Sequence, residues 1–148
     1  MAKTATFGAL HVGTSFGVTY ALTGNVAVAG ASTTALNATR SVVASGTGSL
    51  SVDGDLQLDS ATVTASKAAN ASLTAAGNLT INANGAASAG ATPGLGANLS
   101  LTGARVAQNG NVVLPSGTLN LKATSADADA LSFGVGSLTT VAGSKVAL

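Results

Sequence analysis

The chain has 148 residues and a net charge of +1, and only 7% of its residues are charged, with five aspartates and no glutamate. So few charges exclude a basic surface for phosphate groups, and 3% aromatic residues leave few rings on which bases or sugars could stack. Nucleic-acid binding is therefore not expected. The absence of cysteine also excludes disulfides, thiolate metal sites and cysteine nucleophiles.

Residues 1–30 read MAKTATFGALHVGTSFGVTYALTGNVAVAG and differ from the text that follows. This segment resembles the start of a family of small bacterial inner-membrane proteins, which begin with similar MAKT, LH and YALTG text. Two other interpretations are a signal peptide, with Lys3 as its positive residue and Ala27–Ala29 as its cleavage site, and a cap over a first coil. We therefore divide the chain into residues 1–23, a cap or a signal- or membrane-like remnant, and residues 24–148, a repeat domain.

From residue 24 onward the chain repeats a phrase in which glycine, often followed by asparagine, precedes alternating apolar and polar residues. Alternation with period two predicts β-strands that bury one face, and glycine and asparagine suit the tight turns between them. The phrases are GNVAVAG at 24–30, GDLQLDS at 54–60, GNLTINANG at 77–85, GANLSLTG at 96–103, GNVVLPSG at 110–117 and GTLNLKA at 117–123.

Apolar positions also recur with a longer period, which predicts a solenoid. One series has spacings of 20, 20, 23, 20, 20 and 19 residues and comprises Phe16, Leu36, Leu56, Leu79, Leu99, Leu119 and Leu138. A second series comprises Val28, Leu50, Leu73, Leu95, Val112 and Leu131, and a third comprises Val43, Val63, Ala86, Val106 and Ala126. Three strand positions in about 20 residues predict an all-β, three-sided parallel β-helix.

The core of such a solenoid is expected to be narrow, because its apolar residues are mostly alanine, leucine and valine. In this interpretation Leu79, Leu99 and Leu119 stack inward on consecutive coils. The predicted core residues are Leu36, Leu56, Leu79, Leu99, Leu119, Leu138, Leu50, Leu73, Val112, Leu131, Val63 and Val106. Four asparagines that precede strands are expected either to form a hydrogen-bonded ladder or to act as separate turn residues: Asn25, Asn78, Asn98 and Asn111.

The GNLTINA and G-x-L-x-L phrases in a twenty-residue repeat resemble the haemagglutinin repeats of filamentous haemagglutinin-like exoproteins, from about residue 24 to the C-terminus. The resemblance implies a right-handed parallel β-helix that is exported by two-partner secretion. It also implies a secreted or cell-surface rod that serves adhesion, biofilm formation or contact-dependent inhibition. The sequence shows no NPNG or NPNL secretion motif, no RGD and no toxin domain, so we expect a structural shaft segment rather than an enzyme.

Two other functions are considered: a polysaccharide-acting β-helix enzyme, and a membrane-associated protein driven by residues 1–30. For a shaft segment, the expected partners are the rest of a longer rod or another copy at an open coil edge. A receptor on a host or neighbouring cell is a further expected partner.

Few side chains suggest chemistry, and for each we favour a structural role. His11 is the only histidine, and no motif supplies it with catalytic partners. Asp53, Asp55 and Asp59 are weak candidates for a calcium site, because one D-G-D falls short of a repeated calcium-roll motif. We therefore predict no catalytic residue, no metal site and no cofactor.

The remaining polar motifs also favour structural interpretations. Asp127 and Asp129 are expected in a solvated loop. Thr62 and Thr64 form one T-x-T, whereas an ice-binding face needs that pair on every coil. Four asparagines begin N-x-S/T sequons that arise naturally when asparagine precedes an alternating strand: Asn37, Asn70, Asn78 and Asn98.

Overall fold

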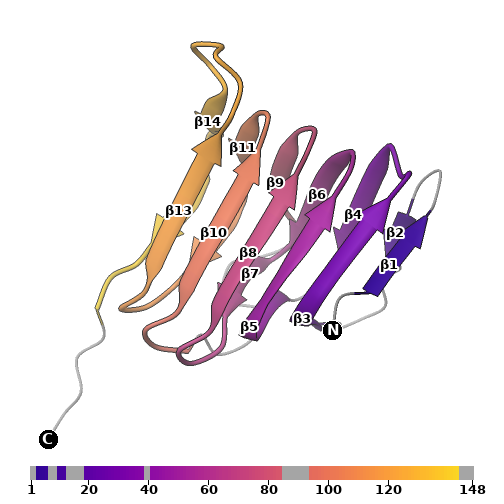
Figure 1. Ribbon diagram of the computed structural model, residues 1–148. Helices are drawn as coiled ribbons and strands as arrows, with labels where there is room; N and C mark the ends of the chain where they lie inside the picture. Colours follow the sequence, from indigo (N-terminus) through magenta and orange to yellow (C-terminus); the bar gives the residue numbers. More distant parts are fainter. Residues whose placement is uncertain (1–2, 7–9, 13–18, 39–40, 85–93, 144–148) are drawn as a thin grey trace, which may run out of the picture.

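The computed structural model describes residues 3–6, 10–12, 19–38, 41–84 and 94–143. All the regular elements of these residues are strands, and Figure 1 shows them stacked as successive coils, with β1 and β2 at one end of the stack and β13 and β14 at the other. The strands are β1 (Lys3–Thr6), β2 (Leu10–Val12), β3 (Thr19–Ala29), β4 (Thr33–Asn37), β5 (Ser41–Val52), β6 (Asp55–Ser60), β7 (Thr62–Ala65), β8 (Asn70–Ala75), β9 (Leu79–Ala83), β10 (Asn98–Gly103), β11 (Val106–Gln108), β12 (Asn111–Val113), β13 (Thr118–Ala123), β14 (Leu131–Phe133) and β15 (Leu138–Thr140).

The strands form three walls around one core. Wall 1 contains β1, the second halves of β3 and β5, and then β8, β10 and β13. Wall 2 is the six-stranded sheet of β2, β4, β6, β9, β11 and β14. Wall 3 contains the first halves of β3 and β5, and then β7, β12 and β15. Because β3 and β5 continue around a corner, walls 1 and 3 belong to one hydrogen-bonded sheet.

The corner in β3 and β5 depends on glycine. Gly24 and Gly46 adopt φ values of 76° and 66°, in the left-handed region that glycine tolerates without strain. Gly48 lies opposite Gly24 in the register, and a Cβ at Gly48 would lie 2.1 Å from the carbonyl oxygen of Gly24. Two glycines therefore let adjacent coils approach at this corner.

All strand pairs are parallel, and inward-facing residues form columns along the stack. One column in wall 1 comprises Val26, Leu50, Leu73, Leu101 and Leu121. One column in wall 2 comprises Leu36, Leu58, Ile81, Gln108 and Phe133. The predicted all-β, three-sided parallel β-helix is thus confirmed. With six strands in wall 2, the stack extends through five inter-strand spacings, roughly 24 Å.

Nine of the twelve predicted core residues are buried. They are Leu36, Leu50, Leu56, Val63, Leu73, Leu79, Leu99, Val106 and Val112. Leu119 is partly buried against the same core. Leu131 and Leu138 are 41% and 44% exposed, because they lie on the last described coil, which no further described strand covers.

The predicted stack of Leu79, Leu99 and Leu119 on consecutive coils is wrong. Leu79 lies in wall 2, where its register neighbours are Leu56 and Val106. Leu99 and Leu119 are neighbours in wall 1. The first apolar series therefore joins residues of different walls.

The other members of the three predicted apolar series also lie in different walls or outside the strands. Within the first series, Leu138 lies in wall 3 and Leu36 pairs with Leu58 rather than Leu56. In the second series Leu95 is exposed outside the strands, whereas the third series mixes Val43 and Val63 of wall 3 with Val106 of wall 2. Ala126 is exposed in the turn after β13, and Phe16 and Ala86 lie outside the described residues.

The coil length varies, which explains the mixing of walls. Along one column the step is 23 residues from Leu50 to Leu73, 28 from Leu73 to Leu101 and 20 from Leu101 to Leu121. The turns absorb the difference, because added turn residues leave strand pairing intact. The twenty-residue spacing of the sequence is therefore an average over unequal coils.

Wall 3 has one described strand fewer than its neighbours. In walls 1 and 2, β8 and β9 lie between the strands of the preceding and following coils. In wall 3, however, β12 pairs directly with β7 through Val112 and Val63. Two side chains reinforce this contact: Asn111 Nδ2 donates to Ala61 O at 3.0 Å, and Thr64 Oγ1 donates to Val113 O at 2.6 Å.

The N-terminal segment adds strands to the same sheets. β1 pairs with β3, and β2 pairs with β4. The predicted boundary between residues 23 and 24 falls inside β3. Among the described residues, none belongs to a helix long and apolar enough to span a membrane.

Candidate functional site

The three aspartates proposed as weak calcium ligands lie at the two ends of β6 and bond to neighbouring coils. Asp53 accepts the backbone N–H of Gly30 at 3.0 Å, and Asp55 accepts that of Asn78 at 2.8 Å. Asp59 lies four residues beyond Asp55 along the strand, roughly 13 Å away. Asp59 therefore cannot share an ion with Asp55. Among the described residues, no three His, Asp, Glu or Cys side chains gather as a metal site would require.

Asp59 belongs to a polar ladder at the far end of wall 2. Its two carboxylate oxygens accept hydrogen bonds from Asn82 Nδ2 at 2.8 Å and Gln57 Nε2 at 2.7 Å. Asn109 Nδ2 in turn donates to Asn82 Oδ1 at 3.4 Å. This ladder ties three successive coils through side chains, so Asp59 has a structural role.

The ladder predicted from four other asparagines does not form. Asn25 and Asn98 belong to wall 1, Asn78 precedes the wall 2 strand β9, and Asn111 begins β12 in wall 3. The four asparagines therefore do not share one column, because Asn25 and Asn98 also hold different register positions within wall 1. Asn25, for example, accepts a hydrogen bond from Ser49 Oγ at 3.1 Å.

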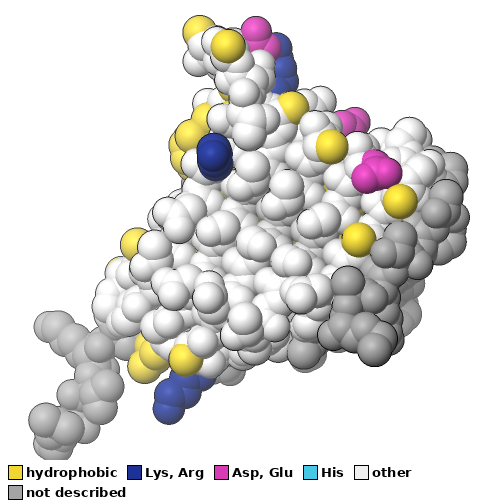
Figure 2. Space-filling model, in the orientation of Figure 1, with side chains coloured by type: hydrophobic (Ala, Val, Ile, Leu, Met, Phe, Trp, Pro, Cys, Tyr) yellow, Lys and Arg dark blue, Asp and Glu magenta, His cyan; other side chains and the backbone are white. Residues whose placement is uncertain are grey.

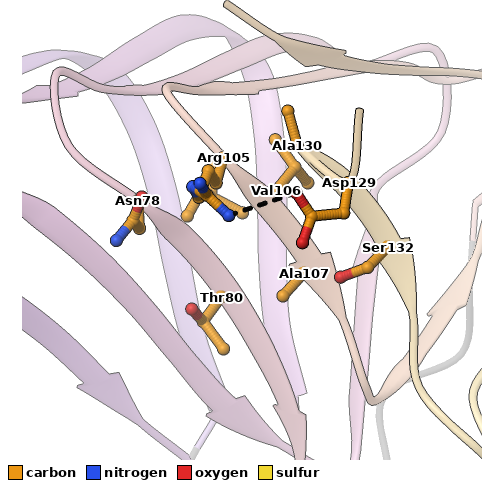
Figure 3. A pocket seen from close by; sticks show the side chains of 9 residues that line it. Asn78, Thr80, Arg105, Val106, Ala107, Asp129, Ala130 and Ser132 are labelled. Carbon is orange, nitrogen blue, oxygen red and sulfur yellow. Dashed lines mark hydrogen bonds and ion pairs between the residues drawn. The ribbon is translucent and has the colours of Figure 1, made fainter. Parts of the chain in front are cut away.

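A charged groove lies on the outside of wall 2. It encloses about 290 Å³ between Thr80, Ala107, Ser132, Arg105 and Asp129. Figure 3 shows the guanidinium of Arg105 directed toward Asp129, which it contacts at 3.5 Å. Asp127 and Asp129, in the turn after β13, both pair with Arg105. The positive charge of Arg105 is therefore already neutralised and is not free to bind an anionic ligand.

Asp127 completes this ionic cluster. Its carboxylate accepts hydrogen bonds from Ser125 Oγ at 2.8 Å and from Arg105. The Ser125 hydrogen bond, followed by the positive charge of Arg105, lowers the pKa of Asp127. The group is therefore ionised at neutral pH and unsuited to act as a general acid. Both partners of the ion pair are about half exposed, so solvent screens it.

The hydroxyl pair singled out as a possible ice-binding unit is buried. Thr62 and Thr64 are 3% and 0% exposed, and Thr64 binds the backbone of β12. A repeated hydroxyl pattern exists instead on the outer face of wall 1. The register aligns Ser49, Ser72 and Ser100 in one column, and Ser51, Thr74 and Thr102 in the next. Figure 2 shows the broad face in this view as largely neutral, with charged side chains toward its margins.

The end of the stack formed by the last described coil is an open apolar mouth. It encloses about 410 Å³ and is lined by Leu119, Leu121, Leu131, Phe133, Thr139 and Val141. Phe133 is 57% exposed, whereas Gln108, one coil deeper in the same column, is fully buried. Among the described residues, no further strand covers this end of the stack.

Gln108 forms the polar floor of that end. Its Nε2 donates to Leu138 O at 3.0 Å and to Gly110 O at 3.2 Å, and its Oε1 accepts from Thr139 Oγ1 at 2.7 Å. These bonds attach wall 3 to wall 2 inside the core. Sequence reasoning missed Gln108, although its place in the alternation Val106–Gln108 marks it as facing inward.

The other residues considered in the sequence are the sequon asparagines and His11, and they lie at separate positions in the described strands and turns. The sequon residues Asn70, Asn78 and Asn98 are exposed, and Asn37 is half-buried. Asn70 and Asn98 are register neighbours on the outer face of wall 1. His11 lies in β2, opposite Ala35 in the register.

Comparison with known proteins gives one partial match. Residues 1–44 are similar to a family whose model is described as a predicted membrane protein, DUF2061. This agrees with the resemblance of residues 1–30 to a small membrane-protein family, and it covers β1 to β4 and the start of β5. Neither the curated proteins nor the solved structures contain a match to the chain.

Proposed function

We propose that the chain is a structural shaft segment of a large secreted or cell-surface bacterial exoprotein, of the adhesin, biofilm or contact-dependent inhibition type. The observation that carries the proposal is the parallel register, which continues from coil to coil in the two complete walls. Such a stack gains length at roughly 4.8 Å per coil. The repeats also resemble the shafts of filamentous haemagglutinin-like exoproteins.

We also propose that the chain is not an enzyme. Asp53, Asp55 and Asp59 hold neighbouring coils together, and Asp127 and Asp129 are paired with Arg105. Catalysis on polysaccharides needs a free acid and base beside a sugar-binding surface. The described carboxylates instead satisfy donors of the protein itself.

A second candidate function is membrane association through the N-terminal segment. The similarity of residues 1–44 to a predicted membrane-protein family favours it. In that case the solenoid would extend from a membrane-bound N-terminus instead of forming part of a released or surface-attached shaft. The two functions predict different locations for the repeat domain.

Surface labelling of cells that make the protein separates the two functions. An antibody against the purified chain should label intact cells, and external protease should remove the label, if the chain is part of a surface shaft. Permeabilised cells are the matched control for antibody access. Protein that is protected in intact cells, and that stays in the membrane during alkaline carbonate extraction, would refute the shaft and support the membrane alternative.

A further inference from the structure

Three successive strands of wall 1 each present a pair of outward hydroxyl groups two residues apart. In β5 the pair is Ser49 and Ser51, and β8 and β10 repeat it as a serine followed by a threonine. The register places the six side chains in two columns, Ser49–Ser72–Ser100 and Ser51–Thr74–Thr102. The repeated hydroxyl pair that an ice-binding face requires is therefore present on wall 1, although the T-x-T of the sequence lies elsewhere.

These hydroxyl groups are available to an external partner. Ser51 and Thr74 are exposed, and the other four side chains are half-buried. Ser49 Oγ donates to Asn25 Oδ1 at 3.1 Å, whereas the other five hydroxyls have no hydrogen-bond partner among the described residues. The outer face of wall 2 differs, because the ladder around Asp59 satisfies its polar groups within the protein.

The spacing of the hydroxyl groups is close to that of an ice lattice. Adjacent coils are roughly 4.8 Å apart along a column, and the two columns are about 6.6 Å apart, which is two residues along a parallel strand. In ice each oxygen forms four tetrahedral hydrogen bonds, so bonds of about 2.75 Å give lattice repeats of about 4.5 Å and about 7.3 Å. From Ser49 to Ser100 the mismatch along the column grows to about 0.6 Å, which rotation about the Cα–Cβ bond can absorb.

The surroundings of the two columns are almost free of charge. Wall 1 faces the viewer in Figure 1, and the same view in Figure 2 shows this face as broad and largely uncharged. The neighbouring outward column contains uncharged side chains, which are Thr47, Asn70, Asn98 and Thr118. In the described part of these three columns, Lys122, which follows Thr102, is the one charged residue. Because a charged group holds its hydration shell strongly, a neutral face suits contact with solid water.

We propose that the outer face of wall 1 is an ice-binding surface, on which the two hydroxyl columns bind the ordered water molecules of an ice crystal. The face is centred on β5, β8 and β10, each of which has a described neighbour on both sides within wall 1. The proposal therefore does not depend on what lies at either end of the stack. It goes beyond the proposed function, because a shaft needs no ligand along its side.

A crystalline polysaccharide is the other periodic solid that offers hydroxyl groups. The apolar faces of its sugar rings pack on aromatic side chains, and the described part of the three columns contains no aromatic residue. Water molecules need only donors and acceptors, and a hydroxyl group supplies both on one atom. The groups on this face therefore fit ice better than a polysaccharide.

The test uses the purified full chain and measures ice recrystallisation and thermal hysteresis, the gap between the melting and freezing points of an ice crystal. Thr74→Lys places a long, hydrated side chain on the middle one of the three strands. Thr80→Lys is the matched control, because Thr80 follows in the next strand of the chain but lies on the outer face of wall 2. Lys122→Thr removes the charge and extends the column of Thr102 by one hydroxyl. Circular dichroism establishes that each variant is folded.

We expect the wild-type chain and Thr80→Lys to slow recrystallisation at the same concentration. Thr74→Lys should require at least about tenfold more protein for the same effect, because its ammonium group keeps liquid water between the face and the lattice. Lys122→Thr should be more active than the wild type at equal concentration. This gain does not rely on a variant that loses function.

Three outcomes would overturn the proposal. One is a wild-type chain that neither slows recrystallisation nor separates the melting and freezing points. Another is an equal loss in Thr74→Lys and Thr80→Lys, since the activity would then not come from wall 1. The third is binding to crystalline cellulose or chitin without an effect on ice, which would identify an ordered polysaccharide as the occupant. These measurements do not depend on where cells place the protein, so their failure is distinct from failure of cell-surface labelling.

Discussion

Replacing Leu99 by alanine should reveal how strongly the coils depend on their inner columns. Leu99 is fully buried in β10 between Ala71 and Leu119 of the adjacent coils. Truncation removes three carbon atoms from a site enclosed on both sides by fixed strands. Leucine-to-alanine changes at such sites cost 2–5 kcal/mol, and we expect a loss of about 3 kcal/mol in the free energy of unfolding.

Two further substitutions make this a test of position along the stack. Leu138 is 44% exposed in β15, so Leu138→Ala should cost less than about 1 kcal/mol. Ser100 neighbours Leu99 but faces outward, so Ser100→Ala should stay within about 0.5 kcal/mol of wild type. Urea unfolding followed by far-ultraviolet circular dichroism measures all three. If Leu99→Ala costs no more than Leu138→Ala, the burial order derived from the register is refuted.

Three other changes test separate features. Thr34→Val should raise the free energy of unfolding by about 1 kcal/mol in urea, because the buried Thr34 hydroxyl has no hydrogen-bond partner among the described residues; a loss of stability would contradict this. Since Ser125 lowers the pKa of Asp127, the stabilising contacts of that carboxylate should persist above the ordinary aspartate pKa and weaken as the pH falls through the lowered one. Ser125→Ala should raise the pKa of Asp127 in a carbon-13 NMR titration, and an unchanged midpoint would disprove the assigned cause. Calorimetry should detect no stoichiometric micromolar calcium binding, because Asp53 and Asp55 already bind backbone N–H groups; binding abolished by changing both to asparagine would overturn this.

The fold class could be predicted from the sequence, because the alternation of apolar and polar residues and the recurrence of strand phrases follow directly from how a β-solenoid is built. Every strand must place apolar residues inward, and every coil must turn three corners to return to its neighbour. LTINA in β9 and NLSLTG in β10 both meet the first need. They nevertheless lie on different walls, because alternation records only which side of a strand faces the core. The wall and register could therefore not be read from these phrases.

The polar ladder and the hydroxyl columns could not be predicted, because the number of residues between contacting positions differs from coil to coil. Asp59 reaches Asn82 across 23 residues, whereas Asn82 reaches Asn109 across 27. The hydroxyl columns of wall 1 likewise involve unequal steps, from Ser49 to Ser72 and then to Ser100. A search for repeats of twenty residues misses both. Variable turn lengths between strands, rather than ambiguous strand patterns, limited the prediction.

The direct pairing of β12 with β7 in wall 3 has a mechanical consequence for a shaft. Between the coils that contain β7 and β12, the described strands of wall 3 span one strand spacing fewer than those of walls 1 and 2, a difference of roughly 4.8 Å. Across a core about 10 Å thick, this wedge inclines successive coils by on the order of 20°. A pull along the axis would then load the three walls unequally. The short wall would take up tension first at the contact between Val63 and Val112.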